Sequence, residues 1–232
     1  MTRIMRIATF NCNSVRSRLD AVLRWLSDYT PDVLCLQETK VTDDLFPTDA
    51  FTAAGWHVAF KGEKSYNGVA IVSKQPADEV SFGLDSEPAD PTRLIHARFG
   101  EVHVVNTYVP QGRDIEHEMY AYKLEWLARL KQYFQRRQAP TRPLLWCGDL
   151  NVARHPIDVS NPETKKDHVC YHHAIREAFE DVLALGFTDL FRRHNPDLVD
   201  YSFYDYRVPF NPEQKRGWRI DYVLATPPLA AK

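Results

Sequence analysis

The order of the apolar segments constrains the fold of this chain more than any other feature of its sequence. Residues 5–10 are apolar and β-prone, residues 18–29 carry apolar side chains at helical spacing, and residues 33–37 are almost entirely apolar. This opening predicts a strand, a helix and a second strand that is buried on both faces. Two strands joined in this way deliver their polar ends to the same edge of a sheet.

The segments that follow mix hairpins with helical crossovers. Residues 56–60 and 68–73 predict paired strands, and residues 93–109 predict a hairpin that turns at Gly100. The pattern then predicts helices over residues 114–137 and 172–185, a buried strand over 143–151, and late strands over 201–207 and 218–225. This mixture indicates an α/β (α+β) fold, a four-layer sandwich of two packed mixed β-sheets flanked by helices. Because no internal repeat or Gly/Ser-rich linker interrupts the pattern, residues 1–232 are expected to form a single domain.

The composition of the chain excludes several classes of protein function. The chain is 44% hydrophobic and 26% charged, which is ordinary for a globular protein. Its net charge of −2 means that any nucleic-acid site must be a local basic patch. Neither an apolar run of membrane-spanning length nor a signal-peptide pattern is present, so no membrane partner is expected. Four cysteines without C-x-x-C spacing indicate reduced thiols in a cytoplasmic protein.

Polar side chains follow several apolar strands at the point where each strand ends. Five of them are Asn11, Glu38, Tyr108, Asp149 and Asn151, and Asp221 stands near the head of the last predicted strand. Loops at strand ends are held by a rigid sheet, and functional sites collect there. Carboxylate and amide oxygens suit a hard cation such as Mg²⁺, and no Ser–His or Cys–His pair is placed as a nucleophile. The set therefore predicts metal-assisted phosphoester hydrolysis.

Each of these residues also has a purely structural interpretation. Asn11 and Asn151 are favoured turn residues, Asp149 follows a glycine as a turn former would, and Glu38 could open a helix. The recurrence of such residues at the ends of apolar strands favours the functional interpretation.

Six ordered motifs strengthen that interpretation. They are TFNCNSVRS, DVLCLQETKV, NGVAIVS, VVNTYVPQG, WCGDLNVA and GWRIDYVLA, and they span almost the whole chain. In this order they resemble the exonuclease III/abasic-site (AP) endonuclease family of the endonuclease–exonuclease–phosphatase superfamily. The Glu-Thr-Lys ending of the second motif points to the DNA-repair branch. The resemblance implies a Mg²⁺-dependent nuclease, with Mn²⁺ as an alternative, that cuts DNA at abasic sites and 3′ ends.

The resemblance also implies roles for individual residues. Glu38 would be the principal metal ligand with Asn11 beside it, and Asp149 and Asn151 would complete the metal and phosphate site. Asp149 would be the acid/base residue, Asn151 would stabilise the pentavalent phosphate, Tyr108 would hydrogen-bond near the scissile oxygen, and Asp221 would hold a histidine in its working tautomer. Together they would neutralise charge that develops during in-line displacement at phosphorus.

Double-stranded DNA with abasic sites or 3′ ends is the implied partner, bound by a monomer. Residues at positions where relatives touch the DNA backbone are Arg16, Lys40, Tyr66 and Gln111. Phe203, Trp218 and Ile220 would form an apolar pocket for the base-free sugar, although an ordinary core role is an equal alternative for Ile220. Further basic residues that could meet phosphates at this edge include Lys61, Arg93, Lys215 and Arg219, and Arg207 occupies a plausible wedge position.

One departure from the family concerns the end of the sequence. The family closes with a Ser-Asp-His motif on a further strand, and these 232 residues do not contain it. We interpret the chain as lacking its natural C-terminus, which would leave Asp221 without its histidine and one sheet without an edge strand. Two other functions stay open: a related phosphoesterase acting on RNA or a small phosphate, and a truncated DNA-binding form with little activity.

Overall fold

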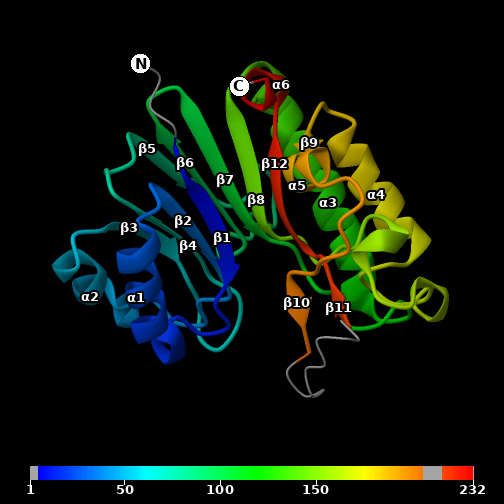
Figure 1. Cartoon of the computed structure of the whole chain (residues 1–232), viewed down its shortest axis with the longest axis horizontal. Helices are drawn as coiled ribbons and strands as arrows, with labels where there is room; N and C mark the ends of the chain where they lie inside the picture. The colour runs from blue at the N-terminus through cyan, green and yellow to red at the C-terminus, as the bar shows by residue number, and fades with distance from the viewer. Residues whose placement is uncertain (1–4, 206–215, 232) are drawn as a thin grey trace. The chain divides into compact units, whose positions relative to one another are not determined.

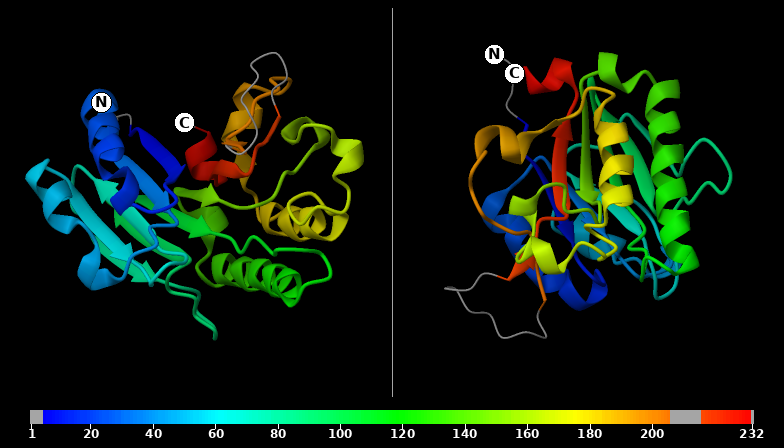
Figure 2. Two further views of the ribbon diagram at one scale, coloured as in Figure 1. Left: turned by 90° about the horizontal axis from the view of Figure 1, so that it is seen from below. Right: turned by 90° about the vertical axis from the view of Figure 1, so that its right-hand side faces the viewer.

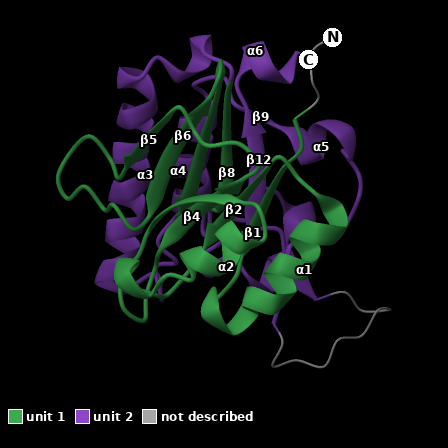
Figure 3. Cartoon of the chain, turned by 90° about the vertical axis from the view of Figure 1, so that its left-hand side faces the viewer, with its two compact units in different colours: residues 1–108, 144–149 green, residues 109–143, 150–232 purple. Residues whose placement is uncertain are grey.

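The computed structural model describes residues 5–205 and 216–231. The chain divides into two compact units, which Figure 3 shows in different colours. Unit 1 comprises residues 1–108 and 144–149, and unit 2 comprises residues 109–143 and 150–232. The prediction of one domain over residues 1–232 stays a prediction. Within the described residues, no helix combines the length and the apolar character needed to cross a membrane.

Unit 1 contains the opening strand–helix–strand and the two hairpins (Figure 1). Its first sheet has the order β1-β2-β4-β3, built from β1 (Ile7–Asn11), β2 (Val33–Gln37), β4 (Val69–Ser73) and β3 (His57–Lys61). Its second sheet runs β5-β6-β7-β8, built from β5 (Glu79–Phe82), β6 (Leu94–Phe99), β7 (Val102–Tyr108) and β8 (Leu144–Asp149). The pairs β1–β2 and β7–β8 are parallel and the others are antiparallel, so both sheets are mixed.

Apolar helix faces and a buried amide pair hold these layers. The helices α1 (Leu19–Tyr29) and α2 (Thr48–Ala53) cover the first sheet, and Leu26 and Phe51 are fully buried in the shared core. Between the two sheets, the Gln37 side chain donates to Asn106 Oδ1 at 2.6 Å. Asn106 in turn donates to the backbone carbonyl of Leu36 at 2.9 Å. Buried polar groups of this kind tolerate little displacement, so they fix how the sheets face each other.

Unit 2 is built around two helices that lie side by side (Figure 2). They are α3 (Glu118–Arg136) and α4 (His173–Leu183). The remaining elements are β9 (Thr188–Asp189), α5 (Leu190–His194), β10 (Phe203–Tyr204), β11 (Gly217–Trp218), β12 (Asp221–Ala225) and α6 (Pro227–Ala230). β12 pairs antiparallel with β9, and β10 pairs antiparallel with β11. The predicted α/β class, with packed mixed sheets and flanking helices, is confirmed.

Several predicted bounds are wrong for identifiable reasons. The long helix begins at Glu118 and not at residue 114, because His117 caps it by accepting a hydrogen bond from the Met119 amide at 3.0 Å. The last strand is broken between β11 and β12, where the Ile220 amide donates to Ser202 Oγ at 3.1 Å. The pattern of apolar residues does not predict α2, β5, β9, α5 and α6, because these elements are short or exposed and carry weak periodicity.

Candidate active site

Three polar side chains from three strand ends of unit 1 form a hydrogen-bonded cluster. Asn11 ends β1, Glu38 follows β2, and Asp149 ends β8. The Asn11 Nδ2 atom donates to Glu38 Oε1 at 2.7 Å and to Asp149 Oδ2 at 2.9 Å. A carboxamide nitrogen has two donors, and here each carboxyl group receives one. The structure therefore brings Asn11, Glu38 and Asp149 together.

Local backbone geometry places both carboxyl groups. Glu38 has φ 52°, in the left-handed region, which turns the chain sharply as it leaves β2. Gly148 has φ 135°, and a Cβ atom there would lie 2.0 Å from the carbonyl oxygen of Thr107 on β7. Only glycine permits that approach, so Gly148 lets β8 deliver Asp149 directly beside Tyr108, its partner in the β7–β8 register.

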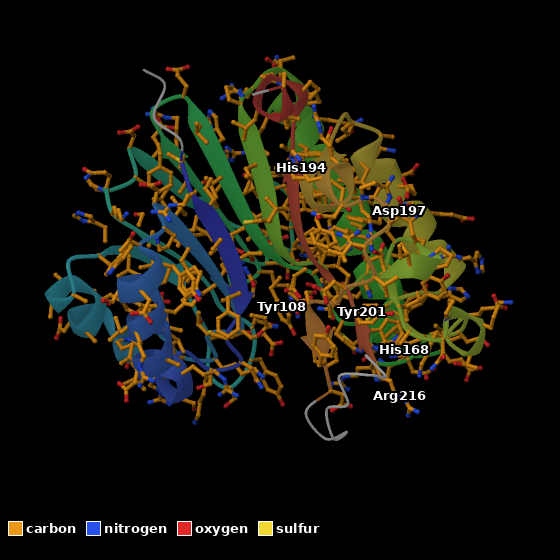
Figure 4. The ribbon with its side chains drawn as sticks, in the orientation of Figure 1. Tyr108, His168, His194, Asp197, Tyr201 and Arg216 are labelled. Carbon is orange, nitrogen blue, oxygen red and sulfur yellow. The ribbon has the colours of Figure 1, made fainter. Side chains whose placement is uncertain are left out.

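Tyr108 ends β7 and is labelled in Figure 4. Its phenol interacts electrostatically with the carboxyl groups of Glu38 and Asp149. Burial raises the pKa of its phenol well above the usual range, and the nearby carboxylates of Glu38 and Asp149 raise it further. The Arg93 guanidinium lies 5.2 Å from the Tyr108 ring centre and opposes this effect. Tyr108 is consequently a phenol that keeps its proton at neutral pH and can donate a hydrogen bond.

The ammonium group of Lys40 forms an ion pair with Glu38. Lys40 Nζ is 2.7 Å from Glu38 Oε2 and 2.6 Å from Asn13 Oδ1. The Asn11 Oδ1 atom accepts from the Asn13 amide at 3.0 Å, so Asn11 presents nitrogen and not oxygen to the carboxyl groups. Within the described ranges, no group of three or more His, Cys, Asp or Glu side chains forms a ready metal site. Oxygen-rich sites with one or two carboxylates nevertheless suit Mg²⁺, which keeps several waters.

Unit 2 contributes Asn151, whose side chain binds backbone, and Asp221, which lies next to Ser202. Asn151 is 5% exposed with φ 51°, and its Nδ2 donates to the Val109 carbonyl at 3.0 Å. Its loop is joined to the head of β12, because the Leu150 amide donates to the Ile220 carbonyl and Tyr222 Oη donates to the Val152 carbonyl, each at 2.8 Å. Burial raises the pKa of Asp221 to about 6, and a hydrogen bond with Ser202 opposes the rise. Among the residues that the structure describes, Asp221 Oδ1 has no hydrogen-bond partner.

The predicted pocket residues differ in exposure. Phe203 and Trp218 stand directly opposite each other in the β10–β11 ladder, and Phe203 is 40% exposed. Trp218 also packs against the ring of His168, with ring centres 4.3 Å apart. Ile220 is buried, which favours the core interpretation for its side chain. The structure thus pairs Phe203 with Trp218 but leaves Ile220 largely within the protein.

Comparison with known proteins decides the family. Residues 8–232 match the Endonuclease/Exonuclease/phosphatase family. The chain belongs to this family. An exodeoxyribonuclease of Bacillus subtilis is 35% identical over 232 residues, which cover 97% of this chain and 89% of that protein.

Solved structures of family members agree with the fold. An AP endonuclease from Archaeoglobus fulgidus has a TM-score of 0.96 and 51% identity, covering 99% of this chain and 89% of that one. A 3′-5′ exonuclease (NExo) from Neisseria meningitidis has a TM-score of 0.93 and 37% identity, covering 98% and 89%. These relatives confirm the exonuclease III/AP endonuclease branch that the motifs indicate, and they make the chain a hydrolytic DNA-repair nuclease of a generally metal-dependent family.

The predicted DNA-contacting residues of this family member lie mostly at the surface. Arg16, in a short 3-10 helix, Tyr66 and Gln111 are exposed, and Lys40 is partly exposed. Two other basic residues are engaged elsewhere. Arg219 is 3% exposed and donates to Asp158 Oδ1 at 2.7 Å and to Asp189 Oδ2 at 2.8 Å, so the prediction that it grips phosphate is wrong. Lys61 is paired with Asp43 at 2.5 Å, and Arg207 and Lys215 lie outside the described residues.

Some residues near the site were missed by sequence reasoning. Ser202 binds the backbone of Asp221, and Lys123 binds the backbone of Asn151. Serine and lysine are ordinary surface residues, so nothing in their local sequence marks these roles. Arg93, one of the basic residues predicted near this edge, lies against the ring of Tyr108.

Proposed function

We propose that this nuclease hydrolyses phosphodiester bonds of double-stranded DNA at abasic sites and at 3′ ends, with Mg²⁺ as its metal. The observation that carries the proposal is the Asn11 carboxamide bound to both Glu38 and Asp149, which brings together two carboxyl groups from strand ends of two different sheets. The names of the relatives support the substrate: an AP endonuclease, a 3′-5′ exonuclease, and a 3′ phosphatase bound to a DNA hairpin product.

The donor set fits a divalent cation. Glu38 and Asp149 would hold it, with Asn11 and Asn151 alongside, and the Lys40 ammonium supports the assignment because it already places positive charge at Glu38. When bound, the metal would offset negative charge on the phosphoryl oxygens. Because Lys40 is partly exposed, its side chain can leave Glu38 for a DNA phosphate at little cost.

Four side chains transfer the proton or stabilise charge in this proposal. Asp149 takes or returns one proton between the attacking water and the leaving oxygen. Tyr108 donates a hydrogen bond from a phenol that stays protonated, which its raised pKa supports. The carboxamide of Asn151 donates a hydrogen bond to the pentavalent phosphate. A positioned neutral donor at this point lowers the activation barrier of hydrolysis. Asp221 would hold a histidine in its working tautomer, although no histidine of these 232 residues is assigned to it. The buried Oδ1 without a partner in the described part of the chain supports this role.

DNA binding in this proposal uses the exposed basic and polar residues and the aromatic pair. Arg16, Lys40, Tyr66 and Gln111 contact the backbone without reading sequence. Phe203 and Trp218, together with Ile220, provide the apolar wall for the base-free sugar, and an extruded site that lacks a base is the least costly to flip. We further infer that the protein acts as a monomer in the cytoplasm, where its four buried cysteines stay reduced.

The test is cleavage of a duplex that carries one abasic-site analogue. Purified protein with MgCl₂ should nick the strand beside the analogue and shorten recessed 3′ ends, and EDTA should abolish both reactions. Replacing MgCl₂ by MnCl₂ measures metal preference. Activity on single-stranded RNA or on an inositol phosphate, without activity on the abasic duplex, would favour the related phosphoesterase. Binding of the duplex without cleavage would favour the DNA-binding form.

A further inference from the structure

The ammonium group of Lys123 is completely buried in unit 2. Lys123 lies on α3 with no exposed surface. Its Nζ atom donates to the carbonyl oxygens of Asn151 and Val169, each at 2.7 Å, and of Gln111 at 3.1 Å. An ammonium has three donors, and three backbone carbonyls receive them. Hydrogen bonds from a charged donor are stronger than neutral ones, and burial increases this difference.

The three carbonyls belong to three different loops that carry candidate site residues. Gln111 and Asn151 are themselves predicted to contact DNA and the reacting phosphate. Val169 follows His168, whose ring packs against Trp218. The loops are also joined directly, because the Ala153 amide donates to the Cys170 carbonyl at 2.6 Å. The buried Lys123 ammonium therefore binds the backbone of all three loops.

The path of the Lys123 side chain is closely packed. Gly112 has φ 100°, and a Cβ atom there would lie 3.3 Å from Lys123 Cδ and 3.5 Å from Val169 Cβ. Glycine lets the Gln111 loop approach the lysine stem at this point. The position of Nζ is consequently set by α3 and by the packing around the stem.

Asn151 is the residue most dependent on this support. Its φ of 51° lies in the left-handed region, which non-glycine residues keep when the surroundings hold them there. Lys123 holds its carbonyl, and the Val109 carbonyl holds its carboxamide nitrogen. Loss of the first contact would free the backbone to rotate and carry the carboxamide with it.

We propose that Lys123 is a positioning residue for catalysis, which holds the Asn151, Gln111 and His168 loops in the arrangement that phosphodiester cleavage needs. This inference rests on the proposed function. Lys123 touches no reacting atom, so its removal acts through Asn151 above all. A displacement of about 1 Å at a catalytic group can cost ~10²-fold in rate.

The first experiment compares Lys123→Met with Lys131→Met on the abasic duplex. Methionine keeps the stem and removes the ammonium, and Lys131 is a lysine of the same helix that pairs with Asp181 at 3.3 Å. Lys123→Met should lose about 10²-fold in kcat while KM changes less than about 3-fold, and Lys131→Met should match the unsubstituted protein. A folded Lys123→Met protein with unchanged kcat would overturn the proposal.

The second experiment separates positioning from folding. Lys123→Ala leaves space for a small alkylammonium ion, so butylammonium should restore part of kcat, whereas tetramethylammonium, which has no N–H donor, should not. This variant also decides the matter if Lys123→Met does not fold. A protein that butylammonium returns to the native circular dichroism spectrum without restoring kcat would refute a positioning role.

A third measurement does not depend on activity. The side-chain amide signals of Asn151, assigned with Asn151→Asp, should shift or broaden in the ¹⁵N–¹H spectrum of Lys123→Met and stay in place in Lys131→Met. If these signals respond but the unsubstituted protein cuts no DNA, the proposed function fails and the contact role of Lys123 stands. If the protein cuts DNA but the signals do not respond, the positioning role fails alone.

Discussion

The Asn11 Nδ2 atom lies 2.9 Å from Oδ2 of Asp149, although 138 positions separate the two residues in the sequence. The same nitrogen lies 2.7 Å from Glu38 Oε1. Two carboxyl groups that would otherwise repel each other are thus held at a common donor. This relationship couples the two residues on which the proposed chemistry depends most.

Glu38→Gln should weaken Mg²⁺ binding and lower turnover on the abasic duplex by at least ~10²-fold, because an amide removes the charge that attracts the cation. The fold should persist, since Glu38 stands at a partly exposed strand end. Calorimetric Mg²⁺ titration and initial rates measure the two effects. Glu116→Gln, at an exposed position, is the matched control. Near-normal Mg²⁺ affinity and rate in Glu38→Gln would refute the assignment.

Asp149→Asn should reduce kcat by ~10²–10⁴-fold, the usual contribution of an acid/base group. Binding of abasic DNA should be retained or tightened, because one negative charge beside the phosphates is removed. Fluorescence anisotropy of labelled duplex, together with single-turnover rates, separates the two quantities. A parallel loss of binding and rate would assign Asp149 a structural role only.

DNA affinity should fall steeply with salt, at about 0.9 log units per log unit of salt for each phosphate neutralised. Arg16→Gln should reduce this slope by roughly one phosphate equivalent, because Arg16 is exposed. Arg98→Gln should leave the slope unchanged, because Arg98 is engaged with Glu79 at 2.8 Å and Asp78 at 3.1 Å. A salt-independent affinity would count against DNA and favour a small phosphate as the substrate.

The pKa of Asp221 makes stability depend on pH. Burial raises this pKa from 3.8 to about 6 in the folded protein, so the folded state binds the proton more tightly than the unfolded state. The contribution of Asp221 to stability is fully present below pH 3.8 and is lost as the pH rises through 6. Asp221→Asn should therefore be more stable than the unsubstituted protein at pH 8, by on the order of 3 kcal/mol, with a much smaller difference at pH 4.

Urea unfolding at several pH values measures this difference. Asp181→Asn provides the control, because the Asp181 side chain is 70% exposed. A stability difference that does not change with pH would show that the Asp221 carboxyl is not perturbed by burial.

Sequence reasoning predicted most of the fold because the main elements carry strong local patterns. The residues of β2 and β4 are buried throughout, and their continuous apolar runs predict central strands within a residue or two. The same reasoning failed at Arg219 and Ile220, where the last strand breaks. Nothing in WRIDYVLA predicts the break, because it depends on Asp158 and Ser202, which bind those residues from other parts of the chain.

Part of the candidate site could likewise be predicted from the sequence, and part could not. The polar residues at strand ends identify Asn11, Glu38, Tyr108 and Asp149, since side chains at the ends of buried strands are visible in the sequence as a change from apolar to polar. The sequence could not show that Asn11 points its nitrogen at both carboxyl groups, that Arg219 is buried in an ion cluster, or that Lys123 binds three loops. The apolar patterns that predict strands and helices are formed by neighbouring positions along the chain. These contacts, in contrast, join residues from 12 to 138 positions apart. Only the packing of strands and helices in three dimensions decides which of many polar side chains meet, and therefore which of them can act together.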